Sequence, residues 1–267
     1  VSSILGLKPR EDWEDAAEEA LRVVAERHGC SESEVLTRVA AKQEILFEVA
    51  SFLTIGETHF FRHPSHFEAV TEHLRAHLIG STPQRQAQRA DLCVWSAGCA
   101  SGEEPYSIAI SIVEGIGAWA LPRVRILGTD ASMRSIGRGR HAAYGSWSFR
   151  GAPPWLRSRY FEDEDITGTQ RLDERIRAAV SLEPGNILAR AESIASESVD
   201  IIIFRNVAIY LEREPLRALY RNFERALVPG GLLFTSPSDP RPREGRLEPI
   251  GDITGSVYRR PFGPQPA

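Results

Sequence analysis

Apolar residues in the first eighty positions of the chain recur at helical spacing. From residue 11 to Gly29 they fall on one stripe, which predicts a helix. Ser31 followed by Glu34 is the signature of a capping box, and it predicts a second helix that continues through Val49. A third helix is predicted to begin near Pro64, because proline suits the first helical turn. The polar residues 80–90 that follow are interpreted as a linker.

After residue 90 the pattern changes to short apolar runs that alternate with helical stretches. The runs predict strands over residues 92–97, 123–129, 178–183, 199–204 and 231–236, and the stretches between them predict helices over 103–119, 132–140 and 213–227. Such alternation is typical of a doubly wound, mostly parallel sheet with both faces covered. Residues 141–178 do not fit the alternation and are interpreted as an insertion. A weaker pattern at residues 256–259 predicts an additional edge strand.

These patterns predict an α/β fold with three parts. We expect a small all-α domain over residues 1–79, the linker over 80–90, and a sheet domain over 91–267. The composition of the 267 residues is ordinary for a globular protein. No apolar run approaches the roughly 20 residues of a membrane helix, and no signal peptide is visible.

Charge and cysteine content narrow the functional classes further. The net charge of −4 argues against a general nucleic-acid binder, which needs a basic face. The three cysteines are odd in number and lack metal-ligand spacing, so we expect reduced thiols in a cytoplasmic protein. The tail 261–267 resembles a linker, and we expect the chain to be a piece of a longer protein.

The most informative stretch runs from residue 92 to 106, where a buried strand leads through small residues into a helix. Gly98 is expected to let the backbone approach a ligand closely, as a larger residue would not. Glu103 and Glu104 occupy the first helical turn, where a phosphate would otherwise bind. A cationic, hydroxyl-rich ligand such as S-adenosylmethionine therefore fits better than a pyrophosphate. A purely structural strand–helix turn is the alternative interpretation.

Polar residues follow the predicted strands at the edge where ligands of open α/β sheets bind. Asp130 is expected to accept hydrogen bonds from a ribose diol; the alternative is a helix N-cap, a role that Ser132 could fill instead. Asn186 is placed to hold an adenine edge or, equally, to serve only a turn. Arg205 and Asn206 end an apolar run, where an unpaired charge is costly, and this favours a functional role.

Two further segments carry candidate chemistry. Thr58 and Arg62 could reach the ligand, and the planar guanidinium of Arg62 could bind a carboxylate. The alternative is that this segment is only a turn packed by the neighbouring phenylalanines. His73 and His77 are four residues apart on a predicted helix, which suits zinc. No cysteine lies nearby, so solvated histidines are the preferred interpretation, and no metal site is expected.

Taken together, these motifs resemble the CheR-type chemotaxis receptor methyltransferases. The resemblance is carried, in order and spacing, by Thr58 with Phe60-Phe-Arg62, residues 94–108, Ile126-Leu-Gly-Thr-Asp130, Asn186, residues 204–210 and residues 227–234. It implies a Rossmann-like class I methyltransferase fold with a small β-subdomain inserted near residues 158–180. It also implies methyl transfer from S-adenosylmethionine to receptor glutamates, with S-adenosylhomocysteine as the product.

The resemblance further implies roles for individual residues. Tyr210 matches a tyrosine near the transferred methyl group. The positions that match cofactor contacts are Thr58, Arg62, Glu103, Asp130, Asn186, Ile187, Arg205 and Asn206. A chemoreceptor-like acceptor is implied as partner, which could itself lie in a membrane. Relatives that continue into helical repeats suggest such a region beyond this chain.

Several departures from the family pattern leave alternatives open. Gly56 replaces a common asparagine and His59 a frequent tyrosine, and an arginine near the active site has no clear match around Leu78. Residues 1–50 hold eleven acidic and six basic residues, where the family often has a basic docking face. A catalytically weak or inactive cofactor-binding module is therefore the alternative function. A nicotinamide dehydrogenase is more distant, because the turn has only Gly98 and Gly102.

Overall fold

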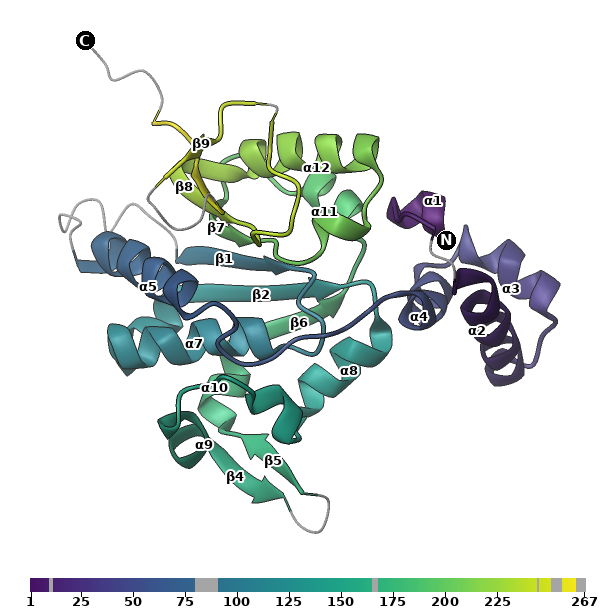
Figure 1. The fold of residues 1–267 in the computed structure, drawn as a ribbon, viewed down its shortest axis with the longest axis horizontal. Helices are drawn as coiled ribbons and strands as arrows, with labels where there is room; N and C mark the ends of the chain where they lie inside the picture. Colours follow the sequence, from purple (N-terminus) through teal and green to yellow (C-terminus); the bar gives the residue numbers. More distant parts are fainter. Residues whose placement is uncertain (10–11, 80–90, 165–167, 244, 251–255, 263–267) are drawn as a thin grey trace.

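The chain folds around a twisted seven-stranded sheet flanked by helices, as seen in a computed structural model that describes residues 1–9, 12–79, 91–164, 168–243, 245–250 and 256–262 (Figure 1). The strand order is β6-β2-β1-β7-β8-β10-β9. The strands are β1 (Leu92–Ala97), β2 (Val124–Asp130), β6 (Val180–Pro184), β7 (Val199–Ile203), β8 (Leu227–Phe234), β9 (Glu248–Pro249) and β10 (Val257–Arg259). The first five in the spatial order are parallel, and β10 is antiparallel to both of its neighbours. The chain adds β2 and β6 on one side of β1 and then β7 and β8 on the other side, so the strand order switches between β1 and β7. Ligands of such sheets bind at this switch point.

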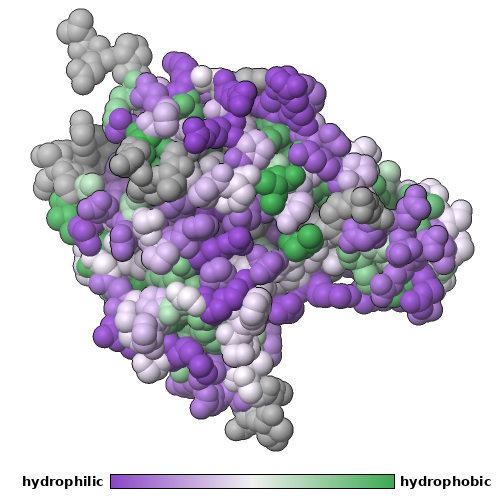
Figure 2. Space-filling view, viewed as in Figure 1, coloured by the Kyte–Doolittle hydropathy of each residue, from purple (hydrophilic) through white to green (hydrophobic). Residues whose placement is uncertain are grey.

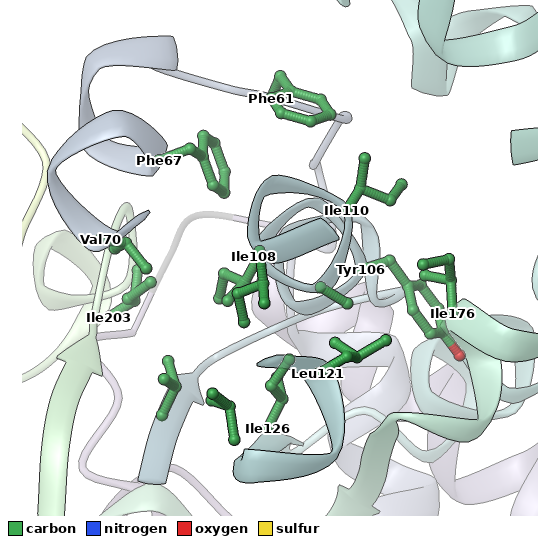
Figure 3. Packing of buried hydrophobic residues seen from close by; sticks show 14 of the residues in the cluster. Phe61, Phe67, Val70, Tyr106, Ile108, Ile110, Leu121, Ile126, Ile176 and Ile203 are labelled. Atoms are coloured by element: carbon green, nitrogen blue, oxygen red, sulfur yellow. The ribbon is translucent and has the colours of Figure 1, made fainter. Parts of the chain in front are cut away.

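Both faces of the sheet are covered, as the uninterrupted apolar strands predict. Along β1, Val94 points into one core and Trp95 into the other, and neither side chain is exposed. The first face is covered by α5 (Pro64–Ile79), α7 (Glu103–Gly115), α8 (Met133–His141) and α10 (Glu174–Ala178), and the second by α11 (Ile187–Ser193) and α12 (Arg213–Ala226). Figure 3 shows the first core, where Phe67 and Val70 of α5 face Ile108 of α7.

All five predicted parallel strands are confirmed to within a few residues. The predicted helix over 103–119 ends earlier, at Gly115, and is followed by a short 3-10 helix, η1 (Ala118–Arg123). Gly117 causes the difference, because its φ of 123° is a backbone conformation that only glycine adopts readily. The predicted strand near residue 256 is confirmed as β10, but it lies inside the sheet, with β9 at the edge.

The N-terminal helices form a core of their own beside the sheet (Figure 1). They are α1 (Ser2–Leu5), α2 (Trp13–His28), α3 (Glu32–Val39) and α4 (Gln43–Leu53). The single helix predicted from residue 31 through Val49 is wrong, because Lys42 has extended backbone angles and divides α3 from α4. The break lets apolar residues of both helices point into one cluster against α2. The helix α5 packs against α7 instead, so residues 1–79 do not share one core.

The insertion contributes a second, three-stranded antiparallel sheet in the order β3-β5-β4. Its elements are β3 (Ala143–Tyr144), η2 (Ser146–Phe149), α9 (Trp155–Tyr160), β4 (Phe161–Glu164) and β5 (Thr169–Leu172). The sheet thus begins before the range of 158–180 expected for the subdomain. Phe60 packs its ring on Tyr144 and Phe161, with centroids 4.9 and 5.2 Å away, so the insertion anchors the segment before Arg62.

Three other expectations concern the linker, the cysteines and membrane-spanning helices. The predicted linker 80–90 lies outside the described residues. Cys30, Cys93 and Cys99 are free thiols, as expected. Among the helices described, none combines the length and apolar character needed to cross a membrane.

Candidate functional site

A cleft opens at the carboxyl ends of the central strands, where the chain reverses its strand order. All predicted site residues except Glu103 line it, namely Thr58, Arg62, Gly98, Asp130, Asn186, Ile187, Arg205, Asn206 and Tyr210. The outer wall comes from the N-terminal segment and from the end of α4, through residues such as Leu5, Lys8, Trp13 and Leu53. The cleft is therefore built from the sheet and closed by the helical part of the chain.

The turn after β1 brings bare backbone to the floor of the cleft. Gly98 and Gly102 have φ values of 86° and 88°, and Ala100 adopts a φ of 47°. A Cβ on Gly98 would lie 2.4 Å from Cγ2 of Val207, so no side chain fits there. The backbone N–H of Ala100 donates to Oδ2 of Asp130 at 2.9 Å, which ties this turn to the end of β2. Glycine at position 98 is thus required both by its conformation and by close packing.

Asp130 is held by backbone amides rather than by a cation. Its Oδ1 accepts from the N–H of Ser132 at 2.8 Å, and its Oδ2 accepts from Ala100. The hydroxyl of Ser132 caps α8 by accepting from the N–H of Ser135, as the sequence predicts. Burial raises the pKa of the Asp130 carboxyl, although these two bonds oppose that shift. Each carboxylate oxygen keeps a lone pair that could accept from a sugar hydroxyl.

The two glutamates that open α7 point in different directions. The Glu103 side chain is buried away from the cleft, where its carboxylate accepts from the hydroxyls of Ser101 and Ser148 at 2.8 and 2.9 Å. Burial raises its pKa. Glu104 lines the cleft instead. Neighbouring helical positions differ by about 100° in direction, so the sequence could place a carboxylate in this turn but not decide which one faces the ligand.

Arg205 follows β7 and is buried, with its charge fully paired. Its Nη2 lies 2.6 Å from Oε2 of Glu104, and its guanidinium also donates to the carbonyl of Arg62. Its carbon Cζ lies 5.2 Å from the ring centroid of Phe67. His66 contacts the same guanidinium, and burial, together with the Arg205 charge, lowers the pKa of His66 to about 3. Arg205 therefore links α5, α7 and β7 beneath the cleft.

The side chains of Asn206 and Asn186 both form hydrogen bonds within the protein. Asn206 has a φ of 58°, its N–H donates to Asp239, and its side-chain amide donates to Ser236 at 2.9 Å. Asn186 caps α11 by accepting from the N–H of Leu188, and its Nδ2 donates to the carbonyl of Ile4 at 2.9 Å. The turn role proposed for Asn186 is thus present, while its side chain still lines the cleft.

Thr58 and Arg62 reach the cleft from the segment before α5. Arg62 is half-buried, and its Nη1 donates a long, solvent-exposed hydrogen bond of 3.4 Å to the carbonyl of Glu57. Phe60 and Phe61 are buried beneath this segment, so the packing role and the cleft position occur together. The nearby carboxylate of Glu57 is paired with Arg150 at 2.9 Å and not with Arg62. Arg62 is therefore well placed to bind an incoming carboxylate.

The histidine-rich segment contains no metal centre in the part of the chain described. The rings of His73 and His77 lie with their centroids 4.3 Å apart and their planes tilted by 38°, and Nδ1 of His77 is hydrogen-bonded to the carbonyl of His73. No group of three metal-binding side chains occurs among the described residues. The two histidines lie in a separate depression beside Phe262.

Sequence reasoning missed the contribution of the N-terminal segment. Lys8 and Trp13 line the cleft, and the indole Nε1 of Trp13 is buried without a hydrogen-bond partner among the described residues. They lie about two hundred residues from Tyr210, and no local pattern links them to it. Only the apolar stripe that includes Trp13 signalled a packed face.

The donor set fits S-adenosylmethionine better than a nucleotide phosphate. Asp130 offers acceptors for a ribose diol, and its carboxylate, which is held by backbone amides rather than by a cation, suits a ligand that carries a sulfonium and an ammonium. Ile187 and Val207 supply apolar surface for a purine. The carboxylates at the start of α7 oppose an anion at the helix N-terminus.

Comparison with known proteins adds an independent finding. Residues 56–246 match the family model described as "CheR methyltransferase, SAM binding domain". The chain is similar to a probable biofilm formation methyltransferase WspC from Pseudomonas putida, with 33% identity over 85% of this chain and 51% of that protein. It is similar to chemotaxis protein methyltransferase 2 of Pseudomonas aeruginosa, with 34% identity over 70% of this chain and 64% of that protein. A probable chemotaxis protein methyltransferase of Rhizobium etli is 29% identical over 75% of this chain and 72% of that protein. The chain thus spans about half the length of the Pseudomonas putida relative.

Proposed function

Because the chain belongs to the CheR methyltransferase family, we propose that it transfers methyl groups from S-adenosylmethionine to glutamate side chains of a chemoreceptor-like signalling protein. The observation that carries the proposal is the convergence of Arg62, Asp130 and Tyr210 on one cleft, although they come from three separate segments of the chain. The names of the chemotaxis relatives support a receptor as the acceptor, and the WspC relatives support a receptor of a biofilm-control system.

The residues that would hold the cofactor divide by chemistry. Asp130 would accept from the ribose, Asn186 and Ile187 would contact the adenine, and Arg62 would bind the cofactor's carboxylate. Arg205 would act indirectly, since its guanidinium is already paired with Glu104. When bound, the cofactor supplies an electrophilic methyl group on a cationic sulfur.

The protein's task in such a reaction is positioning rather than proton transfer. A glutamate side chain has an ordinary pKa near 4.3 and is already ionised at neutral pH. Alignment of reactants can supply roughly 7–11 kcal/mol of a barrier. Tyr210 lines the cleft from a 3-10 turn, η3 (Ala208–Tyr210), and its hydroxyl would donate a hydrogen bond that orients the acceptor carboxylate. No general base is needed.

The family's docking surface would differ in this chain. The helix α2 carries Glu14 and Asp15 in its first turn, and α3 carries Glu32 and Glu34. Hydrophilic residues dominate the visible face of these helices (Figure 2). Since like charges repel, an acidic receptor surface would dock elsewhere on the chain, or the receptor would offer basic residues here.

Two measurements on the same protein test the proposal. Calorimetry with S-adenosylhomocysteine reports cofactor binding, and labelled S-adenosylmethionine with chemoreceptor cytoplasmic fragments reports transfer. We expect binding together with base-labile methyl esters on glutamates, which mass spectrometry would locate. Binding without transfer to any candidate receptor would favour the inactive module. Failure to bind would reject both functions.

A further inference from the structure

The N-terminal segment is joined by its backbone to the turn that carries Tyr210. The N–H of Lys8 donates to the carbonyl of Tyr210 at 2.7 Å, and the N–H of Glu212 donates to the carbonyl of Gly6 at 2.7 Å. Leu7 and Leu211 form an antiparallel bridge between these two bonds. Residue 8 is therefore held beside Tyr210, although the two positions are far apart in the chain.

The path of this segment is further determined by Gly6. Its φ is 65°, and a Cβ there would lie 2.8 Å from both Leu188 Cδ1 and Pro215 Cβ. The segment passes so close to α11 and α12 that only glycine fits. The side-chain amide of Asn186 also donates to the carbonyl of Ile4. The main chain that presents Lys8 is thus anchored on both sides of the bridge.

The Lys8 side chain is exposed at the cleft. Its Nζ donates to the carbonyl of Ile209 at 3.2 Å, and the side chain lines the cleft. No carboxylate among the described residues lies within ion-pair distance of it. An ammonium has three donors, so two remain for a ligand.

The other two cations that line the cleft, Arg205 and Arg62, have different partners. Arg205 is only 3% exposed and is paired with Glu104. Arg62 lies in the segment before α5, four residues after Thr58, and is assigned to the cofactor's own carboxylate. Of the three cations that line the cleft, Lys8 is the one whose backbone is hydrogen-bonded to Tyr210, and no carboxylate among the described residues pairs with its ammonium.

We propose that Lys8 binds the carboxylate of the acceptor glutamate and holds it beside Tyr210. The inference rests on the proposed function and deepens it by naming a residue that selects an ionised acceptor. In the transfer, a carboxylate oxygen forms a bond to the methyl carbon while the carbon–sulfur bond breaks and its electron pair goes to sulfur; no proton moves. The ammonium attracts the anion, and once the acceptor is methylated the neutral ester loses this attraction, which favours its release.

The composition of the chain makes Lys8 directly observable. The chain has only two lysines, Lys8 and Lys42, and Lys42 lies at the start of α4 outside the cleft. Reductive methylation with carbon-13 keeps the positive charge and gives each lysine an NMR signal. With S-adenosylhomocysteine bound, we expect added glutarate to shift the Lys8 signal saturably and to leave the Lys42 signal unchanged. Neutral dimethyl glutarate should shift neither. Equal shifts for both lysines with glutarate would overturn the proposal.

Kinetics with a chemoreceptor cytoplasmic fragment provide the second readout. Lys8→Ala should raise the KM for the fragment on the order of tenfold, while Lys8→Arg should recover most of the loss. Lys42→Ala is the matched control and should behave as wild type. The affinity for S-adenosylhomocysteine should stay within about twofold in all three variants. An unchanged KM in Lys8→Ala would overturn the Lys8 proposal alone. If the wild type binds S-adenosylhomocysteine but methylates no fragment, the proposed function fails, and the glutarate experiment still decides whether Lys8 binds carboxylates.

Discussion

The guanidinium of Arg205 and the carboxylate of Glu104 form a buried ion pair directly beneath the cleft. Nη2 lies 2.6 Å from Oε2, and the side chains are 3% and 12% exposed. The pair joins the end of β7 to the first turn of α7, and Oε1 of Glu104 also accepts from the hydroxyl of Ser96 on β1. Three elements that form the cleft floor therefore share one charge network.

Breaking this pair should be strongly destabilising. Arg205→Met leaves the Glu104 carboxylate buried and unpaired, which we expect to lower the free energy of unfolding by about 3–5 kcal/mol. The double variant Arg205→Met/Glu104→Leu should lose less than the sum of the two single variants. Urea denaturation measures all three. Arg22→Met is the exposed control, since Arg22 and Glu26 are 60% and 71% exposed; its loss should stay below about 1 kcal/mol. Additive losses would contradict the coupling.

Removing the Tyr210 hydroxyl should affect turnover rather than cofactor binding. We expect Tyr210→Phe to lower kcat about ten- to hundredfold, because a hydrogen bond that orients the nucleophile is lost. The affinity for S-adenosylhomocysteine should remain within about twofold. Tyr220→Phe is the matched control, since the Tyr220 hydroxyl donates to the carbonyl of Pro240 away from the cleft floor. It should change stability by about 1 kcal/mol and leave kcat unchanged. Wild-type turnover in Tyr210→Phe would exclude Tyr210 from the reaction.

Neutralising Asp130 should weaken cofactor binding. In Asp130→Asn one of the two backbone donors, Ala100 or Ser132, loses its acceptor, and the bonds to a ribose weaken. A hydrogen bond to a charged group contributes about 1.5–3 kcal/mol, so we expect at least about a tenfold rise in Kd for S-adenosylhomocysteine by calorimetry. Ser132→Ala removes only the cap of α8 and should cost about 1 kcal/mol of stability without changing Kd. Equal effects of both variants on Kd would show that Asp130 acts through the helix.

His66 should make stability depend on pH. Burial and the neighbouring Arg205 lower its pKa to about 3, so between about pH 6.5 and 3 the unfolded chain binds a proton that the folded chain does not. The contribution of His66 to the free energy of unfolding is fully present above about pH 6.5. It decreases by up to about 1.4 kcal/mol for each pH unit below that value. Glu103 and Asp130 act in the opposite sense, because burial raises their pKa values.

The His66 contribution can be isolated by difference. Urea denaturation of the wild type and His66→Gln at pH 7, 6 and 5 should show the stability advantage of the wild type shrinking as the pH falls. His59 has a pKa lowered to about 4, chiefly by burial, but it is present in both proteins and cancels. A stability difference that is the same at all three pH values would mean that His66 does not titrate as proposed.

Substituting Gly98 should damage the cleft floor. In Gly98→Ala the new Cβ would meet Val207 at 2.4 Å, in addition to the strain of a positive φ. We expect a loss of stability above about 2 kcal/mol and weaker binding of S-adenosylhomocysteine. Gly29→Ala separates the two causes, because Gly29 also has a positive φ but nothing lies within 4 Å of its Cβ. That variant should lose about 1 kcal/mol and bind normally.

Much of the site could be predicted because parallel strands bring their carboxyl ends to one edge. Asp130 and Arg205 each follow an apolar run, so the order of strands along the chain already placed them together. The direction of each side chain could not be predicted in the same way. Glu103 and Glu104 share one helical turn, yet only Glu104 faces the cleft. Similarly, periodicity marked the apolar positions of α3 and α4 but not the break at Lys42 between them.

The local pattern of apolar, glycine and charged residues was sufficient to predict the α/β architecture and the strand ends, because the period of the apolar positions distinguishes strands from helices and turn residues mark where they end. The order and spacing of short motifs carried the family resemblance. The outer wall of the cleft depends on contacts between residues about two hundred positions apart, such as Lys8 with Tyr210 and Ile4 with Asn186. The periodicity of apolar residues along the chain does not predict those contacts. They join the N-terminal segment to turns that follow strands of the sheet, so only the folded structure shows that Lys8 lies beside Tyr210.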